Sequence, residues 1–175
     1  MFGLKVAVYW GCVIPTTQYA YEMSVREVLP KLGVELVDLN DVSCCGVPLR
    51  SVNTFASVYL AARNLAIAEK TGLKDLLVLC NGCHLSFSEA LHFLKNDKEL
   101  RQKIDALLMD EGLQLKGSLR VWHLVDLLHD SIREETIRNS VKKRLNSLKF
   151  VSQYGCHIIR PSRLGRVDDP ENPKK

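Results

Sequence analysis

The sequence predicts an α/β fold with an open, mostly parallel sheet flanked by helices, and three observations support this. Short apolar runs at Lys5–Trp10, Val34–Leu39 and Asp75–Leu79 have the length of buried parallel strands. Segments of helical periodicity separate these runs, as in βαβ units. A group of cysteines follows each run, so we expect ligand side chains on loops at the carboxyl ends of strands.

The first two connections predict helices with recognisable ends. The sequence Pro15-Thr16-Thr17 can begin a helix over Gln18–Leu32, which stops at Gly33. Pro30 in its last turn should fray or kink it. A long helix rich in alanine and leucine is expected over Thr54–Lys70.

The second half of the chain predicts shorter elements, and their order continues the alternation of strands and helices. In chain order they are helices at Ser86–Leu94 and Asp97–Met109, a strand at Leu119–Trp122, helices at Leu124–His129 and Ile132–Leu145, and a last strand at Phe150–Tyr154.

Composition is that of an ordinary globular protein of 175 residues, with 46% hydrophobic and 25% charged residues. No apolar run approaches the roughly 20 residues that span a bilayer, so we expect no transmembrane segment. No signal peptide is visible, which predicts a cytoplasmic location. The net charge of +4 is mild, and its basic stretches at Lys142–Arg144 and Arg160–Arg166 fit solvated surface better than a nucleic-acid partner.

Five of the six cysteines form one pattern that predicts a metal centre. They are Cys12, Cys44, Cys45, Cys80 and Cys83. Thiolates in such a set are soft ligands for an iron–sulfur cluster or for zinc. The cluster is favoured, because structural zinc takes four ligands and would leave one cysteine over. Disulfides are disfavoured, because the spacings are short and no secretory context is visible.

Residues beside the cysteines have expected roles in supporting the centre. Gly11, Gly46 and Gly82 should allow close backbone approach and N–H donation to sulfide. Tyr9 and Trp10 are expected to pack around the site. His84 either supports the centre or caps a helix start, whereas Arg50 and Arg160 are expected to be solvated, with binding of an anionic substrate the less favoured role. His157 would contact substrate only in a longer protein.

One internal repeat is visible, because an apolar run followed by Gly-Cys occurs at Gly11-Cys12 and again at Gly155-Cys156. Cys156 would then be the first ligand of a second, incomplete set, although a free thiol is the favoured interpretation. The repeat predicts a first cysteine-rich domain over residues 1–149 and the start of a second over residues 150–175.

Together these motifs resemble the B subunit of heterodisulfide reductase, of the CCG cysteine-rich type. The resemblance rests on Tyr9–Cys12, Cys44–Gly46, Cys80–Cys83 and Tyr154–His157 with Arg160–Ser162, and it covers essentially the whole chain. It implies that all five cysteines of the first set hold one noncubane [4Fe–4S] cluster. It also implies a redox function in which the disulfide of coenzyme M and coenzyme B is reduced between two such clusters.

The resemblance further implies partners of this chain. Electrons would arrive through A- and C-type heterodisulfide reductase subunits or equivalent electron-transfer chains. Because the second cysteine set is incomplete, another chain would have to supply the second CCG motif. The alternative is a non-catalytic interaction module, stabilised by zinc or by a cluster, within a redox complex.

Overall fold

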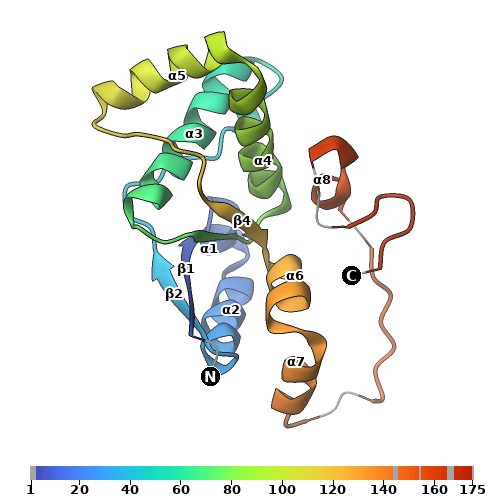
Figure 1. Cartoon of the computed structure of the whole chain (residues 1–175). Helices are drawn as coiled ribbons and strands as arrows, with labels where there is room; N and C mark the ends of the chain where they lie inside the picture. Colours follow the sequence, from blue (N-terminus) through green and yellow to red (C-terminus); the bar gives the residue numbers. More distant parts are fainter. Residues whose placement is uncertain (1–2, 144–145, 154, 165–167, 175) are drawn as a thin grey trace.

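A parallel sheet of four strands forms the centre of the computed structural model, which describes residues 3–143, 146–153, 155–164 and 168–174 (Figure 1). The strands are β1 (Leu4–Tyr9), β2 (Val34–Asp38), β3 (Asp75–Val78) and β4 (Arg120–His123), and their order in the sheet is β2-β1-β3-β4. In register, Ala7 of β1 lies opposite Val37 on one side and Leu76 on the other. The predicted α/β class with an open parallel sheet is confirmed.

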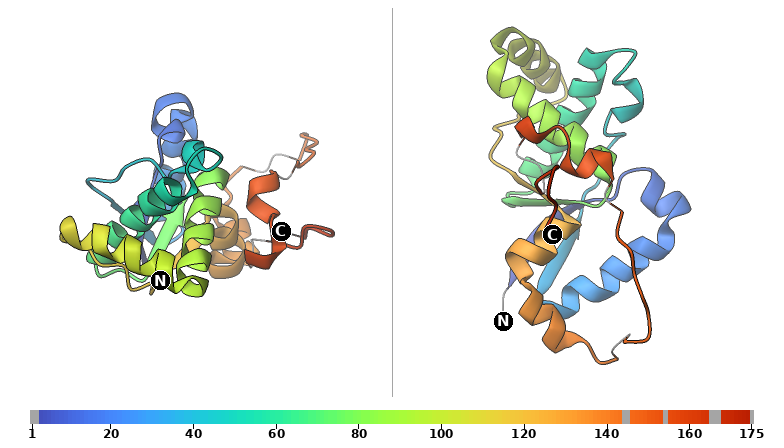
Figure 2. Two further views of the ribbon diagram at one scale, coloured as in Figure 1. Left: turned by 90° about the horizontal axis from the view of Figure 1, so that it is seen from above. Right: turned by 90° about the vertical axis from the view of Figure 1, so that its right-hand side faces the viewer.

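The helices connect the strands and cover both faces of the sheet (Figures 1 and 2). In chain order they are α1 (Val13–Thr17), α2 (Tyr19–Lys31), the 3-10 turn η1 (Val47–Leu49), α3 (Thr54–Lys70), α4 (Asn81–Asn96), α5 (Lys98–Asp110), α6 (Leu124–Asp126), the π-helix η2 (Leu127–Ile132), α7 (Glu134–Ser140), α8 (Cys156–Ile159) and the 3-10 turn η3 (Ser162–Leu164). Among the residues that the structure describes, no helix has the length and apolar character needed to cross a membrane.

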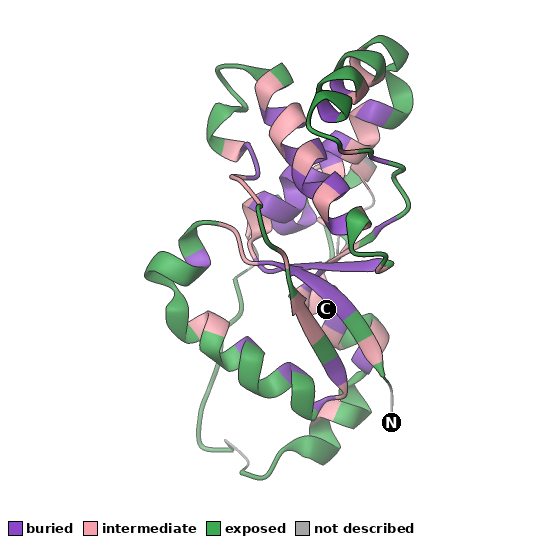
Figure 3. Ribbon diagram, turned by 90° about the vertical axis from the view of Figure 1, so that its left-hand side faces the viewer, coloured by how far each residue is buried: buried purple, intermediate pink, exposed green. Residues whose placement is uncertain are grey.

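Side chains of β1 alternate between two apolar layers, one on each face of the sheet. Val6 and Val8 pack with α2 and η2, whereas Ala7 and Tyr9 pack with α3, α4 and α5. Figure 3 shows the buried residues concentrated in the strands and on the inner sides of α3 and α4. Because both faces are covered, the strands read as continuous apolar runs in the sequence.

The order of the strands determines where a ligand site can form. From β1 the chain crosses one face through α2 to β2, and it then returns across the other face through α3 to β3. The loops that leave β1 and β3 therefore diverge at the carboxyl edge of the sheet. The space between such diverging loops is where open α/β sheets bind their ligands.

Two helix predictions need correction. Helix α4 begins at Asn81 rather than Ser86, so Cys83 lies in its first turn and not in a loop. The expected helix over Ile132–Leu145 is shorter, because a π-helix continues to Ile132 and α7 ends at Ser140. Leu145 itself lies outside the described residues.

The predicted last strand is wrong over residues 150–153, which have no regular secondary structure; Tyr154 lies outside the described residues. Phe150 is 74% exposed and Val151 is 98% exposed. Apolar, β-branched composition favours a strand only when a neighbouring strand supplies hydrogen bonds, and within the described residues this segment has none.

Candidate metal centre

The cysteines of the predicted set follow three neighbouring strands at the carboxyl edge of the sheet. Cys12 directly precedes α1, Cys44 and Cys45 lie between β2 and η1, Cys80 directly precedes α4, and Cys83 is in the first turn of α4. Their position follows from the parallel sheet, since all carboxyl ends of its strands meet at one edge.

Cys83 lies at the centre of this group. Its thiol forms hydrogen bonds with the thiols of Cys45 and Cys80. A Cβ atom built on Gly11 would lie 3.2 Å from Cys83 Sγ, so the loop that carries Cys12 passes directly over Cys83. The described structure therefore brings all three cysteine loops together.

The electrostatics of the group favour thiolates at two positions. The hydrogen bond from Cys83 is the largest effect on Cys80 and, with the N–H groups of Cys83 and Gly82, lowers the pKa of Cys80 to about 5. A hydrogen bond from Cys83 also lowers the pKa of Cys45, assisted by the N–H of Val47. Because the thiolate is the form that binds metals, these groups are prepared for coordination.

Tyr9 fills the space beneath the group, as predicted. It is 1% exposed, its ring contacts Phe87 edge to face at 4.8 Å, and its hydroxyl donates to the Ser43 carbonyl at 2.7 Å. Burial, followed by the charges of the surrounding cysteines, raises the pKa of Tyr9 far above its usual value. Tyr9 therefore stays neutral and holds the start of the Cys44 loop.

Trp10 packs against the apolar layer of α2, which Cys80 of the site also contacts. Since neighbouring residues of a strand point to opposite faces, Trp10 turns to the layer of α2. Its indole N–H donates to Asp38 at 2.6 Å, and the Arg26 guanidinium stacks over its ring at 4.2 Å. Trp10 thus ties the end of β1 to the end of β2.

Two of the three predicted glycines have a clear conformational role. Gly11 and Gly46 have positive φ angles of 72° and 88°. A Cβ atom on Gly46 would lie 2.5 Å from the Ser57 carbonyl oxygen of α3, so only glycine allows this approach. The N–H groups of Gly46 and Gly82 donate to the sulfur atoms of Cys44 and Cys80. Donation to sulfide stays a prediction.

His84 is a buried residue that faces another histidine, His123 at the end of β4. The two side chains are 5% and 4% exposed, and their rings meet edge to face at 5.7 Å. His123 Nδ1 accepts the Val125 N–H at 3.3 Å. A role for His84 as a helix cap is excluded, because α4 begins at Asn81.

The two arginines predicted to be solvated differ in the structure. Arg50 pairs with the buried carboxylate of Glu89 at 2.5 Å, although its own side chain is 44% exposed, so it is more than a solvated surface residue. Arg160 is exposed and pairs with Glu171 at 3.0 Å, as expected for surface.

The second Gly-Cys pair lies beside the first site without joining its five thiols. Cys156 is exposed and begins α8, which packs against α4. Gly155 is in close contact with Asn81, the first residue of α4. After the hydrogen bond from Cys83 and the backbone N–H groups, the charge of His157 contributes to the lowered pKa of Cys80.

Sequence reasoning missed three residues that hold the Cys44-Cys45 segment: Asn64, Ser86 and Glu89. Asn64 and Ser86 hydrogen-bond the backbone of the segment, and Glu89 binds Arg50 just after it. All three are buried polar residues in helices whose buried side chains are mostly apolar. This is the one signal in the sequence that marks them, because buried polar groups require partners.

All six cysteines lie in the described residues and are free thiols, so the structure forms no disulfide between them. Within the described residues, no three His, Cys, Asp or Glu side chains could hold a single metal ion. The five thiols are neighbours, and Cys83 forms hydrogen bonds with both Cys45 and Cys80. Five soft donors from three loops fit a larger, multi-iron group.

Comparison with known proteins identifies the class of domain. Residues 6–88 match the family model of the CCG cysteine-rich domain. The chain is 33% identical over 171 residues to the B subunit of the ferredoxin/F420H2-dependent CoB-CoM heterodisulfide reductase of Methanosarcina acetivorans. That alignment covers 97% of this chain and 56% of the relative. The predicted similarity to the B subunit of heterodisulfide reductase is confirmed.

Other relatives are a subunit of a different reductase and an iron–sulfur protein. The 8-methylmenaquinol:fumarate reductase membrane anchor subunit of Wolinella succinogenes is 30% identical over 170 residues, covering 97% of this chain and 58% of the relative. An iron–sulfur protein of Methanococcus maripaludis is 31% identical over 103 residues, covering 58% of this chain and 19% of the relative. The chain thus spans just over half of the first two relatives.

A solved structure supports the fold alone. The crystal structure of a hypothetical protein from Helicobacter pylori aligns with a TM-score of 0.60 and 20% identity, covering 71% of this chain and 25% of that chain. Taken together, the match to the CCG family model and the iron–sulfur relatives support an iron–sulfur cluster as the cofactor. They give no support to zinc.

Proposed function

We propose that this chain is an iron–sulfur redox subunit of a heterodisulfide-reductase-like complex that reduces a disulfide of the CoM-S-S-CoB type. The observation that carries the proposal is the meeting of Cys12, Cys44–Cys45 and Cys80–Cys83 at the switch point of a parallel sheet. The 33% identity to the B subunit of a heterodisulfide reductase supports it.

The five thiolates would hold one [4Fe–4S] cluster, of the noncubane type. When bound, the cluster supplies single-electron transfer to a substrate at the edge of the sheet. The chain itself contributes the ligands, the backbone N–H groups that stabilise thiolate charge, and the apolar layer beneath them around Tyr9 and Phe87. Cys12 is exposed, which leaves one side of the site open to a substrate.

Cleavage of one disulfide consumes two electrons and two protons and yields two thiols. One cluster supplies one electron at a time, so the proposal includes a chain that carries the second CCG motif. Electrons would enter through A- and C-type subunits or equivalent electron-transfer chains, and we place the complex in the cytoplasm.

The proposed domain boundary follows from the same repeat. Residues 1–149 would form the first CCG domain, and residues 150–175 would begin the second, with Cys156 as its first ligand. The exposed apolar segment at Phe150–Val151 and the packing of α8 beside Cys80 support this division.

The test is the metal content of the chain purified without oxygen, together with its electron paramagnetic resonance spectrum after oxidation. About four irons and matching sulfide per chain are expected. One zinc per chain without iron, in iron-replete cells, would overturn the proposal and favour the alternative of a structural interaction module.

A further inference from the structure

We propose that Asn64 and Ser86 are positioning residues that fix the backbone of Ser43–Cys45 and so determine where the sulfur atoms of Cys44 and Cys45 lie. The inference rests on the proposed function, because it assigns these residues to the cluster site. Neither residue touches the expected cluster position through its own side chain; each acts through the cysteine backbone.

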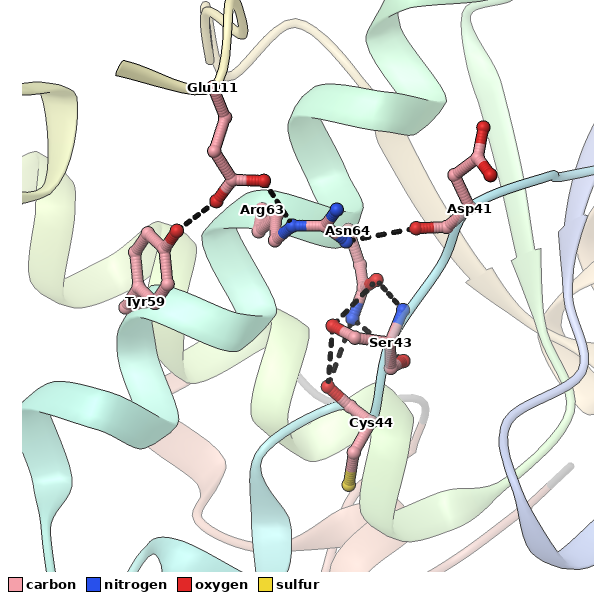
Figure 4. Close-up of polar contacts among 7 residues, drawn as sticks. All are labelled: Asp41, Ser43, Cys44, Tyr59, Arg63, Asn64 and Glu111. Atoms are coloured by element: carbon pink, nitrogen blue, oxygen red, sulfur yellow. Dashed lines mark hydrogen bonds and ion pairs between the residues drawn. The ribbon is translucent and has the colours of Figure 1, made fainter. Parts of the chain in front are cut away.

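Asn64 uses both ends of its amide on this segment (Figure 4). Its Oδ1 accepts the backbone N–H of Ser43 at 2.8 Å, and its Nδ2 donates to the carbonyl oxygens of Ser43 and Cys44, both at 3.1 Å. The side chain is 1% exposed in the middle of α3. Burying an amide lowers the stability of the fold unless its polar atoms are hydrogen-bonded. The burial of Asn64 is therefore compensated by its hydrogen bonds to this loop.

Ser86 holds the next carbonyl from the opposite side. Its hydroxyl, in a residue that is 6% exposed, donates to the Cys45 carbonyl at 2.5 Å. Ser86 lies on α4, three residues after Cys83. Consecutive carbonyls of the two cysteines are therefore tied to two different helices.

Holding both carbonyls fixes the direction of both side chains. A peptide unit is planar, so a fixed carbonyl fixes the orientation of the Cα atoms that flank it. Cys44 is half-buried whereas Cys45 is buried, which shows that the two side chains meet different surroundings. If the backbone turned, both sulfur atoms would move, and Cys45 would lose its hydrogen bond with Cys83.

A second layer of contacts holds the start of the same loop, also shown in Figure 4. Arg63, next to Asn64, donates to the Asp41 carbonyl at 2.9 Å and pairs with Glu111 at 2.6 Å. Tyr59 also contacts Glu111. This layer is more exposed and farther from the cysteines, so we assign the positioning role to Asn64 and Ser86.

The experiment compares N64A, N64D and S86A with N53A as the matched control. Asn53 caps the same helix α3 by accepting the Ala56 N–H at 3.0 Å, and among the described residues its side chain forms no hydrogen bond with the cysteine segment. N53A therefore weakens α3 without releasing the loop. N64D keeps an acceptor for the Ser43 N–H but loses the two donors, which isolates the carbonyl contacts.

The first readout is the rate at which a ferrous chelator removes iron from the anaerobically purified chain, with the electron paramagnetic resonance spectrum of each variant. We expect N64A, N64D and S86A to lose iron about 10- to 100-fold faster than the wild type and to show shifted g-values. N53A should keep the wild-type rate and spectrum.

The second readout needs no cluster. In the metal-free chain, alkylation of Cys44 and Cys45 by iodoacetamide is measured relative to the exposed Cys156. Several-fold faster alkylation in N64A, N64D and S86A, with Cys156 unchanged, supports the inference. If these variants match N53A in both readouts, the inference is overturned. A wild-type chain without iron overturns the proposed function instead, and the alkylation rates still decide the role of Asn64 and Ser86.

Discussion

The chain contains the same local pattern twice, and the two copies end in different structures. In the first, β1 is buried between β2 and β3, and Gly11 turns the chain into Cys12 and α1. In the second, residues 150–153 have no regular secondary structure and no partner strand among the described residues, and a short helix begins at Cys156. The comparison shows how much of the site comes from the neighbours of the pattern.

The neighbours of β1 supply four of the five thiols. Cys44 and Cys45 follow β2, and Cys80 and Cys83 follow β3, so a strand paired on both sides brings its own Gly-Cys turn to two further ligand loops. The second copy has the turn and one cysteine without these loops. A CCG site is therefore a property of a sheet and not of the Gly-Cys sequence.

The largest expected difference between the copies concerns the cysteines. Cys83→Ala removes the thiol that contacts Cys45 and Cys80, so the chain should lose nearly all of its iron. Cys156→Ala should keep the wild-type iron content, because Cys156 does not join the five thiols. Iron and sulfide analysis of the anaerobically purified variants checks this. Full iron content in Cys83→Ala would contradict the proposed ligand set.

The glycines give the next largest difference. Gly11→Ala forces alanine into a φ of 72° and brings its Cβ to 3.2 Å from Cys83 Sγ, so the free energy of unfolding should fall by about 3 kcal/mol. Gly155 has a φ of −74°, and a Cβ there meets only the movable end of the Asn81 side chain. Gly155→Ala should therefore change stability by less than about 0.5 kcal/mol. Urea unfolding measures the free energy of unfolding of both variants. Equal losses in the two variants would show that the backbone is equally constrained at Gly11 and Gly155.

Substitutions in the apolar runs that precede the two Gly-Cys pairs should show a somewhat smaller difference in stability. Val8→Ala empties space in a layer where Val8 is 1% exposed, and we expect a loss of about 2 kcal/mol. Val151 is 98% exposed, so Val151→Ala should be neutral within about 0.5 kcal/mol. Thermal and urea unfolding measure both. A comparable loss in Val151→Ala would mean that the second copy is also packed in solution.

The sheet could be predicted from the sequence because each of its strands is an apolar run with a cysteine group or a helix beyond it. The same reasoning failed at Phe150. The composition of a segment indicates that it can form a strand, but it does not indicate whether a neighbouring strand is available to pair with it. It also placed the start of α4 too late, because the first turn of that helix carries Cys83 and polar residues instead of an apolar stripe.

The cysteine loops of the site could be predicted as well, because parallel strands end at one edge. The residues that hold these loops could not be predicted. Asn64 and Ser86 come from helices, and their partners are backbone carbonyls 20 and 41 residues away in the chain. Sequence spacing carries no information on such contacts.

The smallest effect concerns Asp38, which anchors the end of the first copy to its neighbour. Burial acts to raise the pKa of Asp38, but hydrogen bonds from Arg26 and Trp10 outweigh it and hold the pKa below the usual 3.8. A lowered pKa in the folded state means that the carboxylate stabilises the fold above its unfolded pKa. That contribution disappears as the pH falls through the lowered value. Because the side chain is 51% exposed, it is worth less than about 1 kcal/mol.

Asp38→Asn therefore should be slightly less stable than the wild type at pH 7, and the gap should close as the pH approaches the lowered pKa of Asp38. Urea titrations of both chains across this range provide the measurement, and added salt should narrow the gap at pH 7. A gap that stays constant at low pH would show that the carboxylate charge does not supply the stabilisation. The end of β1 would then be held by hydrogen-bond geometry and not by charge.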